Sequence, residues 1–484
     1  MADKLAHASP NLSYVLEGLA QNRHVVASQV WRRLQRLGLD TAQTRTPIQE
    51  PRVILEQAPL LVPRTPNLLV GCENVTVDLR GVPLSNSTEE YALRIISCRN
   101  VRILHCEISG PMRAGILVSD CHNLELIGPR VERAGKSALT IAGRSIDILV
   151  ADGTFHQNKG GGIVVCDGSQ NVRIARCRIT DGAGKSNWTS GIVLTDRWVN
   201  NMELDCWDML AEDQYWAKEQ PILDRTAIVS GCIISDCTIA GNMASGVYMD
   251  GALQCAVINN EIENNSKEGI CLDYGASLNV CLFNRLFANG ARYGKTDEDL
   301  ARDHVLRFGR MEDGTAAAKV PAISLDNAAG NVIQHNTIAS NFGSGVKMVR
   351  ASFMNSISFN TILNNNLGTN QLHHFFGVEV GAAPLDGSVT PNEFQELDSS
   401  PSSSNVIHAN IVKGGHYAGL FFAQGTEQNN IFDNIILEPS VWTMESVDVP
   451  SANVSLNNIG FLPSKGIGLS RLVPNIVGLG EMAL

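Results

Sequence analysis

The 484-residue sequence has no long apolar run and no stretch or stripe of basic residues. Without about 18 consecutive apolar residues, no membrane-spanning helix is expected. Without a basic surface, nucleic acids and anionic membranes are not expected partners. Acidic residues outnumber basic ones, 49 to 38. The start, M-A-D-K-L-A-H-A-S-P, lacks the basic-then-apolar order of a secretory signal. We therefore expect a cytoplasmic protein.

Cysteine motifs are also missing, although the chain has twelve cysteines. No two of them form a C-x-x-C pair, and no group of Cys and His has the spacing of a zinc site. Cys98, Cys121 and Cys255 adjoin apolar positions, where a thiol packs as a small hydrophobic group. We expect reduced, buried cysteines and no organic cofactor.

What the sequence does contain is a repeat. Val247 and Ile270, and again Ile323 and Val346, hold equivalent positions about 23 residues apart. Each copy has short strands rich in Ile and Val, separated by Asn and Gly, as in N-V-I-Q-H-N-T-I-A-S-N at 331–341. A single copy cannot bury its apolar face, but stacked copies can. The pattern predicts an all-β solenoid, a parallel β-helix of about twelve coils with three short strands each.

This repeat resembles the right-handed parallel β-helix proteins of the pectate-lyase-like superfamily, over roughly residues 68–460. Residues 12–38 have helical apolar spacing, and the resemblance implies that this helix caps the first coil. We expect a helical cap and connector at 1–66, the β-helix at 67–460 and a tail at 461–484. The resemblance also implies that a homotrimer could form, and that the substrate is a carbohydrate or a small molecule.

Three insertions interrupt the coils near 196–225, 291–321 and 381–404. Long loops on a rigid scaffold commonly form lids or groove walls. The first insertion contains Trp198, whose indole could stack on a sugar ring. His374 lies in the turn before the strand of Glu379 and could reach the same groove.

Three copies of the repeat end in aspartate: G-V-Y-M-D-G at 246–251, G-I-C-L-D-Y-G at 269–275 and A-I-S-L-D-N at 322–327. Side chains alternate along a strand, so Asp250, Asp273 and Asp326 should all point outward while Val247 and Met249 point inward. Equivalent positions in adjacent coils stack about 4.8 Å apart. Such close carboxylates repel one another and should raise a pKa or bind a cation.

Other reactive side chains fall beside these aspartates. Tyr248, Lys347 and Glu379 share a second outward column, and Tyr274 and Arg350 share the turn column that follows. A solvated turn aspartate is the ordinary interpretation of one such residue. Three in one column, with these neighbours, predict a functional site.

Three chemistries fit this site. In the first, resembling the calcium-dependent pectate lyases, Asp250, Asp273 and Asp326 hold Ca²⁺. Lys347 or Tyr248 removes a proton from a uronic-acid sugar and Arg350 pairs with its carboxylate, giving a lyase or epimerase. In the second, paired aspartates serve a glycoside hydrolase or a fructan-type intramolecular glycosyl transferase. In the third, the insertions close a pocket for a small molecule, as in an intracellular isomerase or cyclase, or form a binding scaffold. We favour the first.

Overall fold

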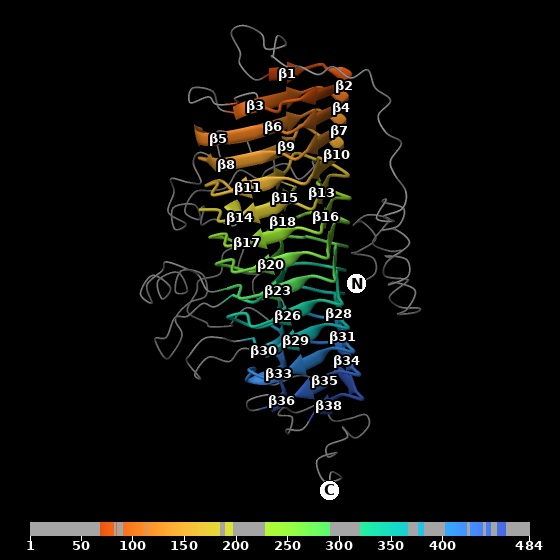
Figure 1. Ribbon diagram of the computed structural model, residues 1–484. Helices are drawn as coiled ribbons and strands as arrows, with labels where there is room; N and C mark the ends of the chain where they lie inside the picture. Colours follow the sequence, from red (N-terminus) through yellow and green to blue (C-terminus); the bar gives the residue numbers. More distant parts are fainter. Residues whose placement is uncertain are drawn as a thin grey trace, which may run out of the picture.

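The computed structural model describes residues 68–81, 84, 91–112, 114–183, 189–196, 228–290, 320–365, 376–381, 402–423, 426–438, 442–446 and 453–460. Within these residues 38 strands form three parallel sheets of 13, 13 and 12 strands (Figure 1). From β3 onward, each strand pairs with the strand three places along the chain, so one turn of the chain adds one strand to each sheet. The predicted parallel β-helix is confirmed.

The three sheets are listed here by their strands in order. The first sheet contains β1 (Leu68–Val70), β3 (Tyr91–Ile96), β6 (Ala114–Ser119), β9 (Leu139–Ala142), β12 (Ile163–Val165), β15 (Ile192–Thr195), β18 (Val247–Asp250), β21 (Ile270–Asp273), β24 (Ile323–Asp326), β27 (Val346–Val349), β30 (Phe376–Val380), β33 (Ala418–Phe422) and β36 (Trp442–Ser446). The second sheet contains β2 (Glu73–Asp78), β4 (Arg99–Leu104), β7 (His122–Ile127), β10 (Ile146–Ala151), β13 (Arg173–Ala175), β16 (Ile233–Ser235), β19 (Ala256–Ile258), β22 (Val280–Leu282), β25 (Val332–Gln334), β28 (Ser356–Ser358), β31 (Val406–His408), β34 (Asn430–Phe432) and β37 (Val454–Leu456). The third sheet contains β5 (Glu107–Met112), β8 (Arg130–Ala134), β11 (Thr154–His156), β14 (Arg178–Thr180), β17 (Thr238–Ala240), β20 (Glu261–Glu263), β23 (Arg285–Phe287), β26 (Thr337–Ala339), β29 (Thr361–Leu363), β32 (Ile411–Lys413), β35 (Ile435–Leu437) and β38 (Ile459–Gly460).

The core is a continuous column of inward-facing aliphatic side chains from all three sheets. In β18, Val247 and Met249 are fully buried in this column, as the alternation of the strand predicts. None of the described cysteines forms a disulfide, and most are buried, as expected.

Stacked asparagines hold the corners of the C-terminal coils. Asn336 shows the pattern: its side-chain nitrogen donates to Asn360 Oδ1 at 3.0 Å and to the Cys281 carbonyl at 2.9 Å, and its Oδ1 accepts from Asn284 N and Nδ2. Three such columns run along the corners. They comprise Asn242, Asn265, Asn289, Asn341 and Asn365; Asn279, Asn331, Asn355, Asn405, Asn429 and Asn453; and Asn260, Asn284, Asn336, Asn360, Asn410, Asn434 and Asn458. Their amides satisfy backbone groups that the corners would otherwise bury unpaired.

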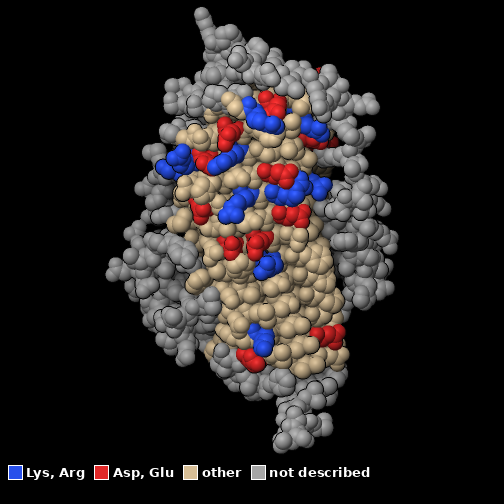
Figure 2. Space-filling view, in the orientation of Figure 1, with Lys and Arg blue, Asp and Glu red and all other residues tan. Residues whose placement is uncertain are grey.

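Charged side chains are unevenly distributed along the solenoid. On the face in Figure 2 they gather over the upper, N-terminal coils, and the lower coils are largely uncharged. Ion pairs between successive coils account for part of the charged region, such as Arg102 Nε to Glu125 Oε2 and Arg176 Nε to Asp152 Oδ1, both 2.7 Å.

Several predictions fall outside the described residues. These are the helix at 12–38 and its capping role, the tail at 461–484 and most of the three insertions. Among the residues that are described, no helix is long and apolar enough to cross a bilayer.

Candidate functional site

The strand register places the three aspartates in one column. Asp250 is the register partner of Thr195 on one side and of Asp273 on the other. Asp326 ends the next strand, β24, and pairs with Val349 of β27. The three carboxylates therefore lie on three adjacent strands of the first sheet, on its outer face, as predicted.

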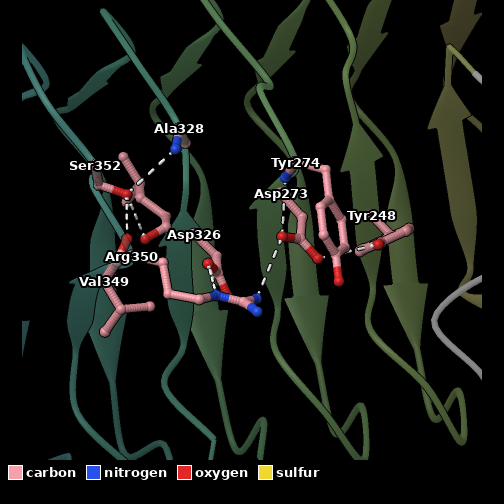
Figure 3. A network of polar contacts seen from close by, with 9 residues as sticks. Tyr248, Asp273, Tyr274, Asp326, Ala328, Val349, Arg350 and Ser352 are labelled. Atoms are coloured by element: carbon pink, nitrogen blue, oxygen red, sulfur yellow. Dashed lines mark hydrogen bonds and ion pairs between the residues drawn. The ribbon is translucent and has the colours of Figure 1, made fainter. Parts of the chain in front are cut away.

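Asp273 is the centre of the polar network in Figure 3. Its Oδ2 accepts a hydrogen bond from the Tyr248 hydroxyl at 3.1 Å, and its Oδ1 accepts one from the backbone N–H of Tyr274 at 2.9 Å. Asp250, Asp273 and Tyr248 are almost completely buried, with 1%, 5% and 1% of their surfaces exposed. Asp326, on the next strand, and Arg350, in the turn after β27, are more exposed.

Arg350 brings a positive charge to the aspartates. Its guanidinium binds both carboxylate oxygens of Asp326, and its Nη2 lies 3.7 Å from Asp273 Oδ1. Its Cζ lies 5.6 Å from the centre of the Tyr274 ring, which is within range of a cation–π interaction. With 28% of its side chain exposed, Arg350 is more accessible than Asp326 (16%) or Asp273 (7%).

The turn after β27 sets the direction of Arg350. Arg350 has a φ of 48°, in the left-handed region. The Ser352 hydroxyl donates to the Val349 carbonyl at 2.7 Å and accepts from the backbone N–H of Ala328 at 3.2 Å, which ties this turn to the preceding coil. The tie orients the guanidinium toward Asp326 (Figure 3).

The surroundings raise the pKa of Asp273, Tyr248 and Arg350. Burial raises the pKa of Asp273 well above its usual value, and the Asp326 and Asp250 carboxylates raise it further, against the opposing charge of Arg350. Burial also raises the pKa of Tyr248, and the nearby aspartates add to this. Burial alone would lower the pKa of Arg350, but Asp326 and Asp273 outweigh it and raise that pKa. The protonated form of Asp273 is therefore favoured relative to that of an exposed aspartate.

Apolar side chains border the network on the same outer face. Val164, Cys166, Val193, Tyr248 and Cys271 form a buried cluster that is separate from the core. This cluster runs down the column next to the aspartates and ends beside Asp273. It supplies the low-polarity surroundings that favour the uncharged form of the carboxyl group.

Asp196 is a fourth carboxylate that the sequence analysis did not assign to the site. It is 5% exposed, and a Cβ on Gly251 would lie 2.3 Å from its Cγ. Gly251 also has a φ of 66°, so glycine allows both this turn and the close approach of Asp196. The signal was present in the sequence, since Asp196 follows the strand position equivalent to Asp250.

Lys347 and Glu379 pair with each other rather than with the aspartates. Lys347 Nζ lies 2.7 Å from Glu379 Oε1, and Ser344 Oγ donates to Glu379 Oε2 at 2.8 Å. Their strands, β27 and β30, are register neighbours as predicted. The assignment of Lys347 as a base stays a prediction, and Trp198 and His374 lie outside the described residues.

The aspartates do not form a ready calcium site. In the part of the chain that the structure describes, no group of three or more His, Cys, Asp or Glu side chains is placed to hold a metal ion. Both oxygens of Asp326 bind Arg350 instead. The residues therefore do not fit the predicted Ca²⁺, and a cationic side chain takes the position facing the carboxylates.

Two family models match the chain. Residues 71–201 match a right-handed β-helix region, and residues 225–372 match the periplasmic copper-binding protein NosD. These matches support the predicted resemblance to the pectate-lyase-like right-handed parallel β-helix proteins. The periplasmic description of the second model contradicts our prediction that the protein is cytoplasmic. A missing leader-like pattern was too weak a basis for that prediction.

Solved β-helix structures are similar at low identity. They include a mutant of the periplasmic alginate epimerase AlgG, with 13% identity over 81% of this chain and 79% of that chain, at a TM-score of 0.44. The A-module of the mannuronan C-5 epimerase AlgE4 from Azotobacter vinelandii has 10% identity over 82% and 86%, at a TM-score of 0.38. An alginate lyase from Paenibacillus sp. has 9% identity over 72% and 92%, at 0.36. No curated protein matches the chain. At these TM-scores the neighbours contribute nothing to the assignment of activity, which rests on the site.

Proposed function

We propose that the protein is a carbohydrate-active enzyme located outside the cytoplasm, and that it cleaves or transfers a glycosidic bond with paired aspartates. The observation that carries the proposal is the environment of Asp273, which is buried, hydrogen-bonded to Tyr248 and raised in pKa. A carboxyl group whose pKa is raised in this way can act as a general acid and donate its proton to the oxygen of a departing sugar.

Asp250 supplies the second carboxyl group that this chemistry needs. It is the register partner of Asp273 on the adjacent strand, at a spacing of about 4.8 Å. Retaining glycosidases hold their two carboxyl groups about 5–5.5 Å apart. In this proposal Asp273 is the acid, and Asp250 is the nucleophile once substrate binding exposes its buried carboxylate. Arg350 with Asp326 forms the polar edge that positions the sugar.

A lyase or epimerase acting on uronic-acid sugars is the second candidate. It is supported by Arg350, the more exposed charged member of the network, whose guanidinium could pair with a substrate carboxylate. In this case the Arg350–Asp273 contact would open when the substrate binds, and Asp273 would neutralise the sugar acid by a hydrogen bond.

Product analysis on a panel of neutral and uronic-acid oligosaccharides separates the candidates. New reducing ends without ultraviolet absorbance are expected for hydrolysis, whereas a lyase releases an unsaturated uronate, whose conjugated double bond absorbs ultraviolet light. Asp273→Asn and Asp250→Asn should each lower kcat about 100-fold or more if they act as acid and nucleophile. Asp152→Asn, on the distant third-sheet corner, is the control that should keep full activity. Full activity in both site variants would refute the proposal.

A further inference from the structure

The outer face of the second sheet changes from partly charged to largely apolar in the middle coils. In the N-terminal coils its outward positions include charged residues such as Arg102, Glu125 and Arg173. From β16 to β25 most outward residues are apolar, with Ser235 and Gln334 as the polar exceptions, and the apolar ones form a cluster of their own, separate from the core. Its members are Ile233, Ala256, Val280, Leu282 and Val332, with Ile258 packed against them.

This apolar face is buried although it points away from the core. Leu282 is 5% exposed and Ile233 4%, while their strand neighbours Cys281 and Ile234 face the core. Every described strand belongs to one of the three solenoid walls, so no described strand lies on top of this face. The outward face of the third sheet in the same coils is polar and more open, with Glu261 and Glu263 half-buried. We infer that the N-terminal segment 12–38 of this chain packs along the apolar outer face of the second sheet, over β16, β19, β22 and β25.

The chemistry of the segment matches this face. Eight of its apolar residues form a stripe: Leu12, Val15, Leu16, Leu19, Val26, Val30, Leu34 and Leu37. Val25 and Trp31 lie outside this stripe. At about 100° per residue in a helix, all eight fall on one side about 100° wide, with Arg23 between the two groups. A helix with one such stripe requires an apolar surface to pack against. At about 1.5 Å per residue, 27 residues extend about 40 Å, so about a third of the helix spans the roughly 14 Å from β16 to β25 and the remainder extends beyond the cluster.

The connection to the solenoid is long enough. From β2 to β25 the second sheet adds eight strands, a distance of about 38 Å at the usual strand spacing. The 29 residues at 39–67 can extend about 95 Å, so the segment can lie alongside the middle coils. This location differs from the cap over the first coil that family resemblance implies.

Photocrosslinking in the full-length protein tests this packing. The photoreactive amino acid p-benzoylphenylalanine replaces Leu282, and crosslinked peptides are identified by mass spectrometry after proteolysis. Because Leu282 is buried, a second variant carries the same group at the half-buried Ile258, where folding is less at risk. The matched control carries it at Glu263, on the third sheet one strand farther along the same coil.

We expect most crosslinked peptides from positions 282 and 258 to derive from residues 12–38, and few or none from position 263. The double substitution Leu16→Asp and Val30→Asp should lower that crosslink yield at least fivefold, and Gln21→Asp, on the opposite side of the segment, should not. Crosslinks to the insertions at 196–225 or 291–321 would overturn the inference. So would crosslinks to a second copy of the chain, seen as a band of doubled mass.

Discussion

The two halves of the solenoid fill equivalent corner positions with different side chains. At the corner before the third sheet, the column holds Cys177 and Cys237 and then changes to Asn260, whose Oδ1 accepts from Cys237 N at 2.9 Å. At the corner before the second sheet, Cys255 N likewise donates to Asn279 Oδ1 at 2.8 Å. The N-terminal half therefore packs thiols at its corners, and the C-terminal half stacks amides.

The difference shows two ways of closing the same turn. A thiol fills space and bonds only weakly, so corners of the first kind depend on apolar packing. An asparagine donates and accepts at once, so corners of the second kind form a continuous hydrogen-bonded column in which each member supports the next. The change from thiol to amide corners occurs in the coils that contain β17–β23. The network around Asp273 lies in these coils and in the two coils that follow.

The largest effect expected from this comparison is on stability. Asn336→Ala removes five side-chain hydrogen bonds, to Asn360, to the Cys281 and Gln334 carbonyls and to the two nitrogens of Asn284. At about 1 kcal/mol per bond, the variant should lose about 5 kcal/mol. Cys237→Ala, in the same column, should lose only about 1 kcal/mol of packing. Urea unfolding midpoints of the two variants measure the difference, and equal losses would contradict the distinction between the two kinds of corner.

The end of one amide column should make the protein sensitive to acid. Asn365 Nδ2 lies 3.3 Å from Nε2 of the buried His416, and burial lowers the pKa of that histidine to about 3. An unfolded histidine binds its proton near pH 6.5, so the folded state loses stability as the pH falls below that value. Between pH 8 and pH 5 the loss should be about 2 kcal/mol.

His416→Gln supplies the matched variant, since a glutamine can accept from Asn365 without titrating. Thermal unfolding from pH 8 to pH 5 should show a smaller decline for the variant than for the wild type. Parallel pH curves for the two proteins would show that His416 does not cause the acid sensitivity.

The contributions of Asp273 and Asp152 to folding stability should change with pH in opposite directions. Burial raises the pKa of Asp273, so the folded protein holds this proton more tightly than the unfolded chain and loses stability as pH rises above about 4. The hydrogen bond from Arg176, opposed by partial burial, lowers the pKa of Asp152, so its contribution is present above pH 4 and lost as pH falls. At pH 8 Asp273→Asn should therefore be more stable than wild type, and Asp152→Asn slightly less stable. Melting temperatures from pH 4 to pH 8 measure both, and a destabilised Asp273→Asn at pH 8 would exclude a raised pKa.

The sequence predicted which residues of the site stack on adjacent strands, but not which side chains bind one another. A repeat of about 23 residues fixes which positions stack, so the column of Asp250, Asp273 and Asp326 follows from spacing alone. The partner of Arg350 depends on the turn held by Ser352, and this local geometry has no periodic signal. The corner asparagines recur with the repeat, so their stacking follows from the same spacing. The apolar outer face around Leu282 was missed, because its residues read as ordinary strand positions.

The smallest expected effect concerns Lys347, whose ion pair with Glu379 is 36% exposed on the lysine side. Pairs of this kind contribute about 1 kcal/mol or less, because water screens the charges. Lys347→Met should therefore leave the urea midpoint nearly unchanged, and Lys347→Arg, which keeps the charge, should match the wild type.

The activity of Lys347→Met distinguishes the two candidate chemistries. Glycosidic cleavage by Asp273 and Asp250 should retain most of its kcat in Lys347→Met, whereas a lyase with Lys347 as its base should lose about 100-fold or more. A stable but inactive Lys347→Met would thus favour the lyase.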